Sequence, residues 1–173
     1  MNVYPIEAGN FKLDGGAMFG VVPKSLWTKT NPADADNMIE MSSRCMLVEN
    51  SDKLILVDTG MGDKQSEKFF KYYKRWGSDN LVKSINSAGF SIDDVTDVLL
   101  THLHFDHCGG AVVWDSSKEA CDVLFKNANY WSNEKHWDWA TNPNPREKAS
   151  FLDKNLFPIK ESGQLKFINN MSK

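Results

Sequence analysis

The chain has 173 residues, of which 41% are hydrophobic and 25% are charged, and its formal net charge is −3. These values are typical of one globular domain with its own core, predicted here over residues 1–173, and the acidic balance argues against nucleic-acid binding. No apolar run approaches the roughly 20 residues of a membrane helix. The first residues also lack the basic segment followed by an apolar one that is typical of a signal peptide. We therefore expect a cytoplasmic protein without a membrane segment, whose three cysteines are free thiols.

The first third of the sequence predicts β-strands. Residues 3–8 and 17–22 are each consistent with a short strand, and a glycine-containing turn lies between them. Residues 27–35 are rich in Asn, Asp and Pro, which indicates a loop. Residues 44–49 and 53–57 are separated by a short polar segment and predict a hairpin. Its second strand is almost wholly apolar, as expected for a strand that is covered on both faces.

Helical patterns follow, and then strands and helices alternate. Aromatic residues at helical spacing predict a helix over 64–76, and apolar residues before Gly89 predict another over 80–88. Residues 96–100 predict a buried strand, which completes an α/β unit. Further along, we expect a helical turn at 111–114, a strand at 122–125, a helix over 132–140, a helix over 146–155, an extended segment at 157–159 and a strand at 165–168.

A cluster of histidines follows the strand at 96–100. Three of the four histidines in the chain, His102, His104 and His107, fall within six positions, and Asp106 lies between the last two. Imidazole and carboxylate groups clustered in this way are typical ligands of a metal such as zinc. A structural or vestigial cluster is the alternative interpretation.

The spacing suggests how the ligands divide between metal ions. Residues two apart in an extended segment point to the same side, so His102 and His104 can bind one ion together. Asp106 and His107 come after the chain turns and can face a second ion. Two ions form a clamp that holds water, and zinc lowers the pKa of that water to about 7. Asp106 is also placed to move a proton to a leaving group.

Asp58 follows the apolar strand at 53–57. An Asp at this position is either a turn-forming residue or part of a site. The residues around Asp58 do not by themselves decide between the turn and the site.

The motif His102-x-His104-x-Asp106-His107, preceded by the strand that ends at Asp58, resembles the metallo-β-lactamase-fold hydrolase superfamily. The resemblance is greatest to its N-acyl-homoserine lactonase-like branch. It implies an αββα sandwich (an α/β fold) with two zinc ions, and opening of a lactone or related ester by zinc-bound hydroxide. It also implies that His102 and His104 bind one zinc ion, that Asp106 and His107 bind the other, and that Asp58 steadies the ligand loop.

The number of ligands in the chain is smaller than this family requires. A catalytic zinc ion normally has three protein ligands, whereas each predicted ion here has two. The remaining histidine, His136, is interpreted as a surface or packed residue. We therefore expect the chain to be the N-terminal portion of such a fold, incomplete at its C-terminus, with an apolar face that favours self-association.

Two classes of function remain open. The first is a metal-dependent hydrolase of a small-molecule lactone or ester, where phosphate, thioester and aryl esters are alternatives on the same metal site. The second is a truncated, catalytically incomplete metal-binding remnant. The sequence leaves the substrate, the identity of the metal, the remaining ligands and the oligomeric state undetermined.

Overall fold

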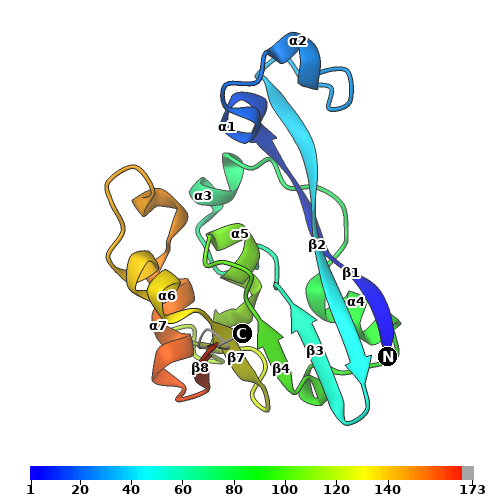
Figure 1. Ribbon diagram of the computed structural model, residues 1–173, viewed down its shortest axis with the longest axis vertical. Coiled ribbons are helices and arrows are strands. Elements are labelled where there is room, and N and C mark those ends of the chain that lie inside the picture. The colour runs from blue at the N-terminus through cyan, green and yellow to red at the C-terminus, as the bar shows by residue number, and fades with distance from the viewer. Residues whose placement is uncertain (169–173) are drawn as a thin grey trace, which may run out of the picture.

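The structure is a computed structural model, and it describes residues 1–168. Its main element is a six-stranded sheet with the strand order β1-β2-β3-β4-β7-β8 (Figure 1). Strands β1 to β3 are antiparallel, and β3, β4, β7 and β8 run parallel to one another. The strands are β1 (Asn2–Asp14), β2 (Met38–Asn50), β3 (Lys53–Val57), β4 (Asp97–Leu99), β7 (Asn129–Ser132) and β8 (Leu165–Phe167). The predicted α/β fold is confirmed.

Strands β1 and β2 extend beyond the rest of the sheet as a long two-stranded arm (Figure 1). The predicted hairpin between β2 and β3 is present, but β2 begins six residues before the predicted strand. The strand predicted at 17–22 is wrong. The Asp14 carboxylate accepts a hydrogen bond from the Ala17 N–H at 2.9 Å, and this cap starts α1 (Gly15–Phe19). A second short helix, α2 (Lys24–Trp27), follows at the tip of the arm.

The helix predicted over 64–76 is present only as α3 (Glu67–Lys71). The residues after it bond to β1 instead of continuing the helix. The Lys12 N–H donates to the Tyr73 carbonyl at 2.7 Å, and the Trp76 N–H donates to the Asn10 carbonyl at 3.2 Å. Tertiary hydrogen bonds therefore override the helical pattern of the sequence.

The helix predicted over 80–88 is confirmed as α4 (Leu81–Ser87). Its first N–H groups bond to the Asn80 side chain, which is a cap, and Gly89 follows with φ of +93°. Leu81 and Ile85 are buried against the sheet. This helix covers the same face of the sheet as α6 (Glu134–Thr141) and α7 (Asp153–Glu161).

The second half of the chain differs more from the predictions. The helical turn predicted at 111–114 is wrong: a 3₁₀ turn ends at Ala111, and β5 (Val112–Trp114) pairs with β6 (Cys121–Val123). The predicted strand at 165–168 is confirmed as β8. Strand β7 matches none of the predicted elements, although it lies inside the parallel part of the sheet.

Helix α6 (Glu134–Thr141) begins two residues later than predicted. The helix predicted over 146–155 is displaced to α7 (Asp153–Glu161), which also replaces the extended segment predicted at 157–159. Leu156 and Ile159 on α7 are fully buried. Their burial stabilises the helix by about 1.5–3 kcal/mol per side chain, enough to offset the hydrogen bond that Pro158 lacks.

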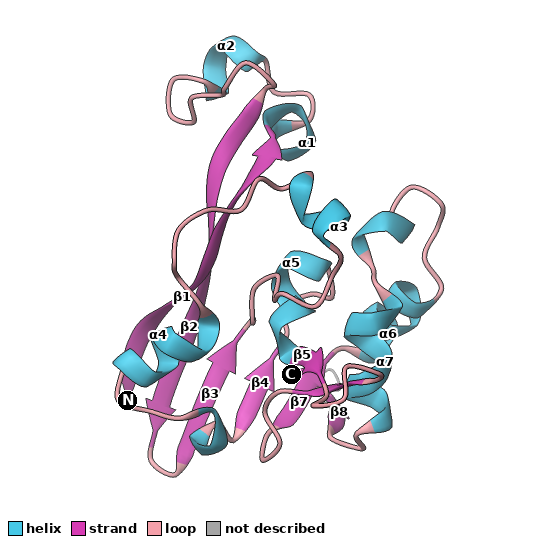
Figure 2. Ribbon diagram, turned by 180° about the vertical axis from the view of Figure 1, so that it is seen from behind, coloured by secondary structure: helices cyan, strands magenta, loops and turns pink. Residues whose placement is uncertain are grey.

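The two faces of the sheet are packed differently. Leu47, Leu56, Val98 and Tyr130 point to one face, where they are fully buried in a core shared with α4, α6, α7 and the β5–β6 pair (Figure 2). The opposite face, here called the open face, carries Val3, Met46, Val48, Ile55, Val57, Leu99 and Trp131, as the strand registers place them. Val3 is 53% exposed and Met46 is 42% exposed. An apolar sheet face therefore remains accessible. No helix in residues 1–168 is long and apolar enough to cross a membrane.

Candidate metal centre

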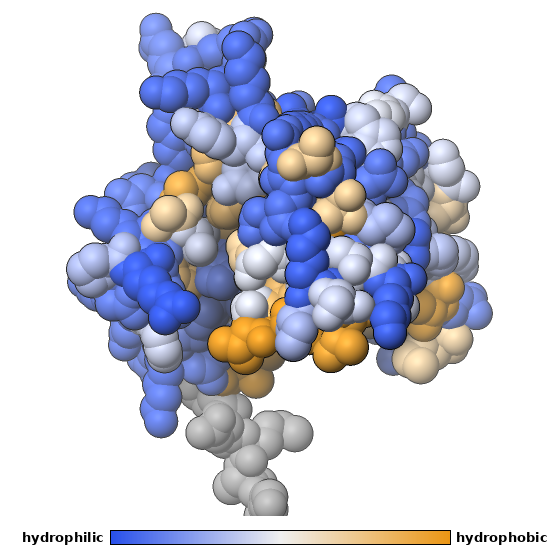
Figure 3. All heavy atoms as spheres, turned by 90° about the horizontal axis from the view of Figure 1, so that it is seen from above, coloured by the Kyte–Doolittle hydropathy of each residue, from blue (hydrophilic) through white to orange (hydrophobic). Residues whose placement is uncertain are grey.

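The candidate residues lie where the parallel strands end. Strands β3, β4 and β7 run in the same direction, so their C-terminal ends meet at one edge of the sheet, the upper edge in Figure 1. Asp58 follows β3, the histidine segment follows β4, and α6 follows β7. Figure 3 looks onto this end of the molecule, where hydrophilic residues predominate. Loops at the carboxyl ends of parallel strands are the usual place for a site in α/β folds.

The backbone around Leu103 directs two imidazoles to one side. Leu103 is fully buried, and residues alternate in direction along an extended segment. His102 and His104 therefore both point away from the core, and their ring centroids are 4.7 Å apart. The short helix α5 (Phe105–Cys108) then turns the chain back, which brings the His107 ring within 3.9 Å of the His102 ring.

Asp58 joins the ends of β3 and β4. Its carboxylate accepts hydrogen bonds from the Thr101 N–H at 2.8 Å, from the Thr101 hydroxyl at 2.8 and 2.9 Å, and from His107 Nδ1 at 2.8 Å. Its backbone has φ of +59°, a left-handed conformation that Asp tolerates better than most residues. Burial acts to raise the pKa of Asp58, but the hydrogen bonds from His107 and Thr101 bring it below its ordinary value. The carboxylate is therefore charged.

The same contact fixes the tautomer of His107. A charged carboxylate only accepts hydrogen bonds, so Nδ1 of His107 carries the proton that faces Asp58. Burial acts to lower the pKa of His107, but the hydrogen bond to Asp58 and the charges of Asp106 and Asp58 raise it overall. Burial lowers the pKa of His102, and the neighbouring His107 and His104 lower it further.

The remaining nitrogen of His107 faces a second candidate ligand. Its Nε2 atom lies 3.7 Å from Asp106 Oδ2. One zinc ion that bonds to each atom at about 2.0–2.2 Å would hold them at a similar separation. Asp106, His107 and the supporting Asp58 thus form the carboxylate–imidazole arrangement that usually orients a metal ligand. The donor set fits a metal ion as a partial site.

The candidate donors do not complete a metal site within the part of the chain that the structure describes. Within residues 1–168, no group of three or more His, Cys, Asp or Glu side chains is arranged to hold a metal ion. His136 does not supply a third donor, because its Nε2 atom accepts a hydrogen bond from the Leu103 N–H at 2.9 Å. This partly buried histidine supports the loop and is not placed as a ligand, in agreement with the packed role expected from the sequence.

Two glycines let the histidine segment pack against the loop after β3. A Cβ atom on Gly109 would lie 2.1 Å from the Met61 carbonyl oxygen, and one on Gly110 would lie 2.1 Å from the Thr59 carbonyl oxygen. The buried Lys64 ammonium donates a hydrogen bond to the Gly109 carbonyl. Burial lowers the pKa of Lys64 to about 8.

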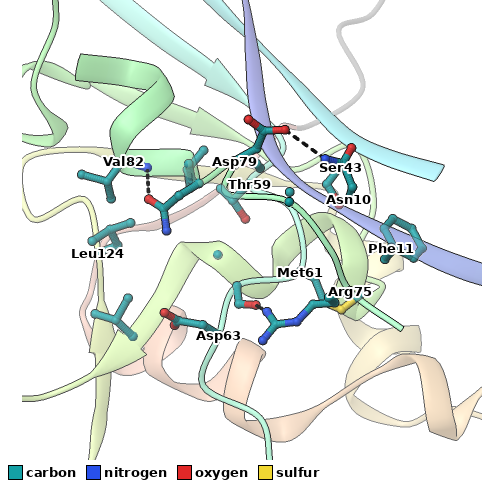
Figure 4. Close-up of a pocket in the computed structure, with 18 of the residues that line it drawn as sticks. Asn10, Phe11, Ser43, Thr59, Met61, Asp63, Arg75, Asp79, Val82 and Leu124 are labelled. Carbon is teal, nitrogen blue, oxygen red and sulfur yellow. Dashed lines mark hydrogen bonds between the residues drawn. The ribbon is translucent and has the colours of Figure 1, made fainter. Parts of the chain in front are cut away.

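A pocket of about 300 Å³ lies next to this loop, and Figure 4 shows its lining. Of the segment from Thr101 to Gly110, only Gly110 lines it. The Arg75 guanidinium in its wall donates to the Gly62 carbonyl at 2.8 Å, and Asp63 and Asp79 also line it. The pocket is therefore distinct from the histidine cluster and carries charges of both signs.

Sequence reasoning missed the hydrogen bonds by which Thr101, Lys64 and His136 support the site. Thr101 precedes the motif, and its hydrogen bonds become visible only when β3 and β4 are paired. The helix predicted over 64–76 includes Lys64, and this prediction hides its contact with Gly109. His136 lies four residues after Ser132, the last residue of the unpredicted strand β7. The aromatic Tyr130-Trp131 pair, typical of strands, was the available signal.

Comparisons with known proteins identify the family of the chain. The family model of the metallo-beta-lactamase superfamily matches residues 39–166. An N-acyl homoserine lactonase from Bacillus cereus is 31% identical over 104 residues, which cover 54% of this chain and 40% of that protein. A probable metallo-hydrolase from Mycobacterium tuberculosis is 31% identical over 108 residues, covering 54% of this chain and 35% of that protein. The relatives are thus metallo-hydrolases and lactonases.

Solved structures give the same result for the fold. A probable metal-dependent hydrolase from Staphylococcus aureus superposes with a TM-score of 0.86 at 30% identity, covering 96% of this chain and 58% of that one. AidC, a dizinc quorum-quenching lactonase, superposes with a TM-score of 0.72 at 28% identity, covering 99% of this chain and 59% of that one. The chain spans little more than half the length of these relatives. It belongs to the metallo-beta-lactamase superfamily, a superfamily of metallo-hydrolases with lactonases among its members.

Proposed function

We propose that residues 1–173 are the N-terminal portion of the domain of a hydrolase that opens a lactone or related ester. In this proposal the chain provides the metal ligands that come from the first half of that domain. The observation that carries this proposal is the convergence of His102, His104, Asp106 and His107 at one edge of the sheet, with Asp58 oriented toward His107. The lactonases among its relatives favour a small-molecule lactone as the substrate.

In this proposal the four ligands divide into two pairs. His102 and His104 hold one zinc ion, and Asp106 and His107 hold the other. When bound, zinc supplies hydroxide at neutral pH and polarises the carbonyl oxygen of the substrate. Asp58 keeps the proton of His107 on Nδ1 and so leaves Nε2 free to bind metal. Asp106 moves a proton to the leaving alcohol.

The experiment measures metal content and hydrolysis on the same preparations. The purified chain is loaded with Zn²⁺, analysed for bound metal, and assayed with an N-acyl homoserine lactone and an aryl ester. We expect His104→Ala and Asp106→Asn to lose zinc and any hydrolysis. Asp93→Asn is the matched control, because Asp93 is exposed and lies outside the cluster. Hydrolysis that persists in His104→Ala would exclude this site.

The alternative is a metal-binding remnant without catalysis. It is favoured for this chain alone because residues 1–168 hold no group of three or more donors arranged for a metal ion. Zinc uptake that depends on His104, without turnover of either substrate, supports the remnant. Turnover of the aryl ester but not of the lactone supports a different ester as the substrate.

We also propose that copies of this chain associate through the open face. The exposure of Val3 and Met46 supports this, because large contiguous apolar patches are rare on monomeric proteins. A second copy would remove these side chains from water.

A further inference from the structure

The structure assigns His136 as a positioning residue that fixes the direction of the two imidazoles on either side of Leu103. This inference rests on the proposed metal site. It concerns a side chain that comes from a different element, α6, and that binds no metal itself.

Leu103 is held at three points. Its side chain is fully buried in the main core. Its carbonyl accepts a hydrogen bond from the Cys108 thiol at 3.3 Å. Its N–H donates to His136 Nε2 at 2.9 Å. Because Leu103 separates His102 from His104, rotation of its backbone would turn both imidazoles. The contact at the N–H is the only one of the three made by a side chain from outside the motif and the core.

His136 is itself held in place. Helix α6 begins at a cap in which the Asn133 side chain accepts hydrogen bonds from the Lys135 and His136 N–H groups at 3.0 and 3.3 Å. The next residue, Trp137, is buried in the main core. The His136 imidazole is therefore presented to the loop from a fixed position on a helix that packs against the sheet.

Phe151 completes the support. Its ring centroid lies 4.9 Å from that of His104 and 5.9 Å from that of His136. Phe151 is buried and packs close to both the candidate ligand and the supporting histidine. The Phe151 ring thus contacts the imidazoles of both His104 and His136.

The contact also specifies the chemical form of His136. An N–H donor requires an unprotonated acceptor, so Nε2 carries no proton and the neutral ring carries it on Nδ1. A glutamine at this position also offers an acceptor, through Oε1, whereas leucine has a similar volume and no acceptor. These two substitutions therefore separate the hydrogen bond from the packing.

The test compares His136→Gln and His136→Leu, with Lys135→Leu as the control on the same helix, because Lys135 is exposed. The first measurement is amide hydrogen exchange of Leu103 by NMR in the metal-free protein. We expect His136→Leu to accelerate exchange at Leu103 about tenfold, the equivalent of 1.4 kcal/mol, while amides of β3 and β4 are unchanged. We expect His136→Gln to preserve most of the protection.

The second measurement is the Zn²⁺ dissociation constant, obtained by competition with a chelator. We expect His136→Leu to weaken binding about 10- to 100-fold, as loss of an orienting partner usually does, and His136→Gln to restore most of it. Unchanged exchange at Leu103 in His136→Leu, or an equal loss of affinity in all three variants, would overturn the inference. A wild-type chain that takes up no Zn²⁺ would overturn the proposed function instead, because the exchange measurement uses metal-free protein.

Discussion

Replacement of Asp58 perturbs the contact that joins the end of β3 to the histidine segment. Its carboxylate accepts from three donor groups: the N–H and hydroxyl of Thr101 and Nδ1 of His107. Asp58→Ala removes all three hydrogen bonds and places alanine in a left-handed conformation with φ of +59°. Asp58→Asn keeps the size of the side chain, an acceptor oxygen and the tolerance for positive φ, but it removes the charge.

The expected losses differ in size. The side chains of Asp58 and His107 are 15% and 36% exposed, so water partly compensates each lost bond, and about 1 kcal/mol per bond is appropriate. The left-handed backbone adds about 1–2 kcal/mol for alanine. We therefore expect Asp58→Ala to lower the free energy of unfolding by about 4 kcal/mol, and Asp58→Asn by about 1 kcal/mol.

The assay is urea denaturation of the metal-free variants, followed by circular dichroism, together with a zinc titration of each folded variant. Asp58→Asn is expected to bind Zn²⁺ about 10- to 100-fold more weakly than the wild type despite its small loss of stability, because an amide no longer fixes the His107 tautomer. An Asp58→Asn variant with wild-type zinc affinity would refute the orienting role. Equal unfolding free energies for the Ala and Asn variants would refute the hydrogen-bond and backbone argument.

Three further predictions concern the packing around the site and the sheet. Lys64 has a pKa of about 8 in the folded protein against 10.5 in an unfolded chain, so its buried charge destabilises the fold below pH 8, and this cost disappears as pH rises toward 10.5. The free energy of unfolding of the wild type, relative to that of Lys64→Met, is therefore expected to rise by about 3 kcal/mol between pH 8 and 10.5 in urea titrations. A difference that does not change with pH would contradict the low pKa of Lys64. Met46→Lys on the open face is expected to reduce the apparent mass of any oligomer in light scattering, whereas unchanged association would place the contact elsewhere. Gly110→Ala is expected to lower the melting temperature much more than Gly89→Ala, because its Cβ meets the Thr59 carbonyl at 2.1 Å while that of Gly89 meets nothing within 4 Å. Gly89 has φ of +93°, so an equal or larger loss in Gly89→Ala would show that backbone strain outweighs the steric clash.

The features that sequence could predict are local ones. The β2–β3 hairpin has apolar runs on both sides of a polar turn, and α4 has both a cap and a terminal glycine, so their signals lie within a few residues. The histidine motif is similarly compact, and the structure brings its four members together at the end of β4. The structure also places Asp58 against His107.

The features that the sequence does not predict depend on contacts between distant segments of the chain. Helix α3 is short because Tyr73 and Trp76 bond to Lys12 and Asn10 of β1, a strand far earlier in the chain. Strand β7 has only four residues, and its place beside β4 comes from pairing rather than from its own pattern. Without β7, α6 has no position in the fold, and the contact between His136 and Leu103 is not accessible to sequence reasoning.

The direction of the parallel strands also divides the molecule for the purposes of protein engineering. Every residue of the candidate metal centre follows the C-terminal end of a strand, whereas the β2–β3 turn lies at the opposite edge of the sheet. Ser51 and Asp52 in that turn are exposed. An affinity tag or fluorescent reporter inserted between them would leave the ligand loops untouched, as exposed turns generally allow. The fold thus offers an attachment point at the end of the sheet that is remote from the candidate metal centre.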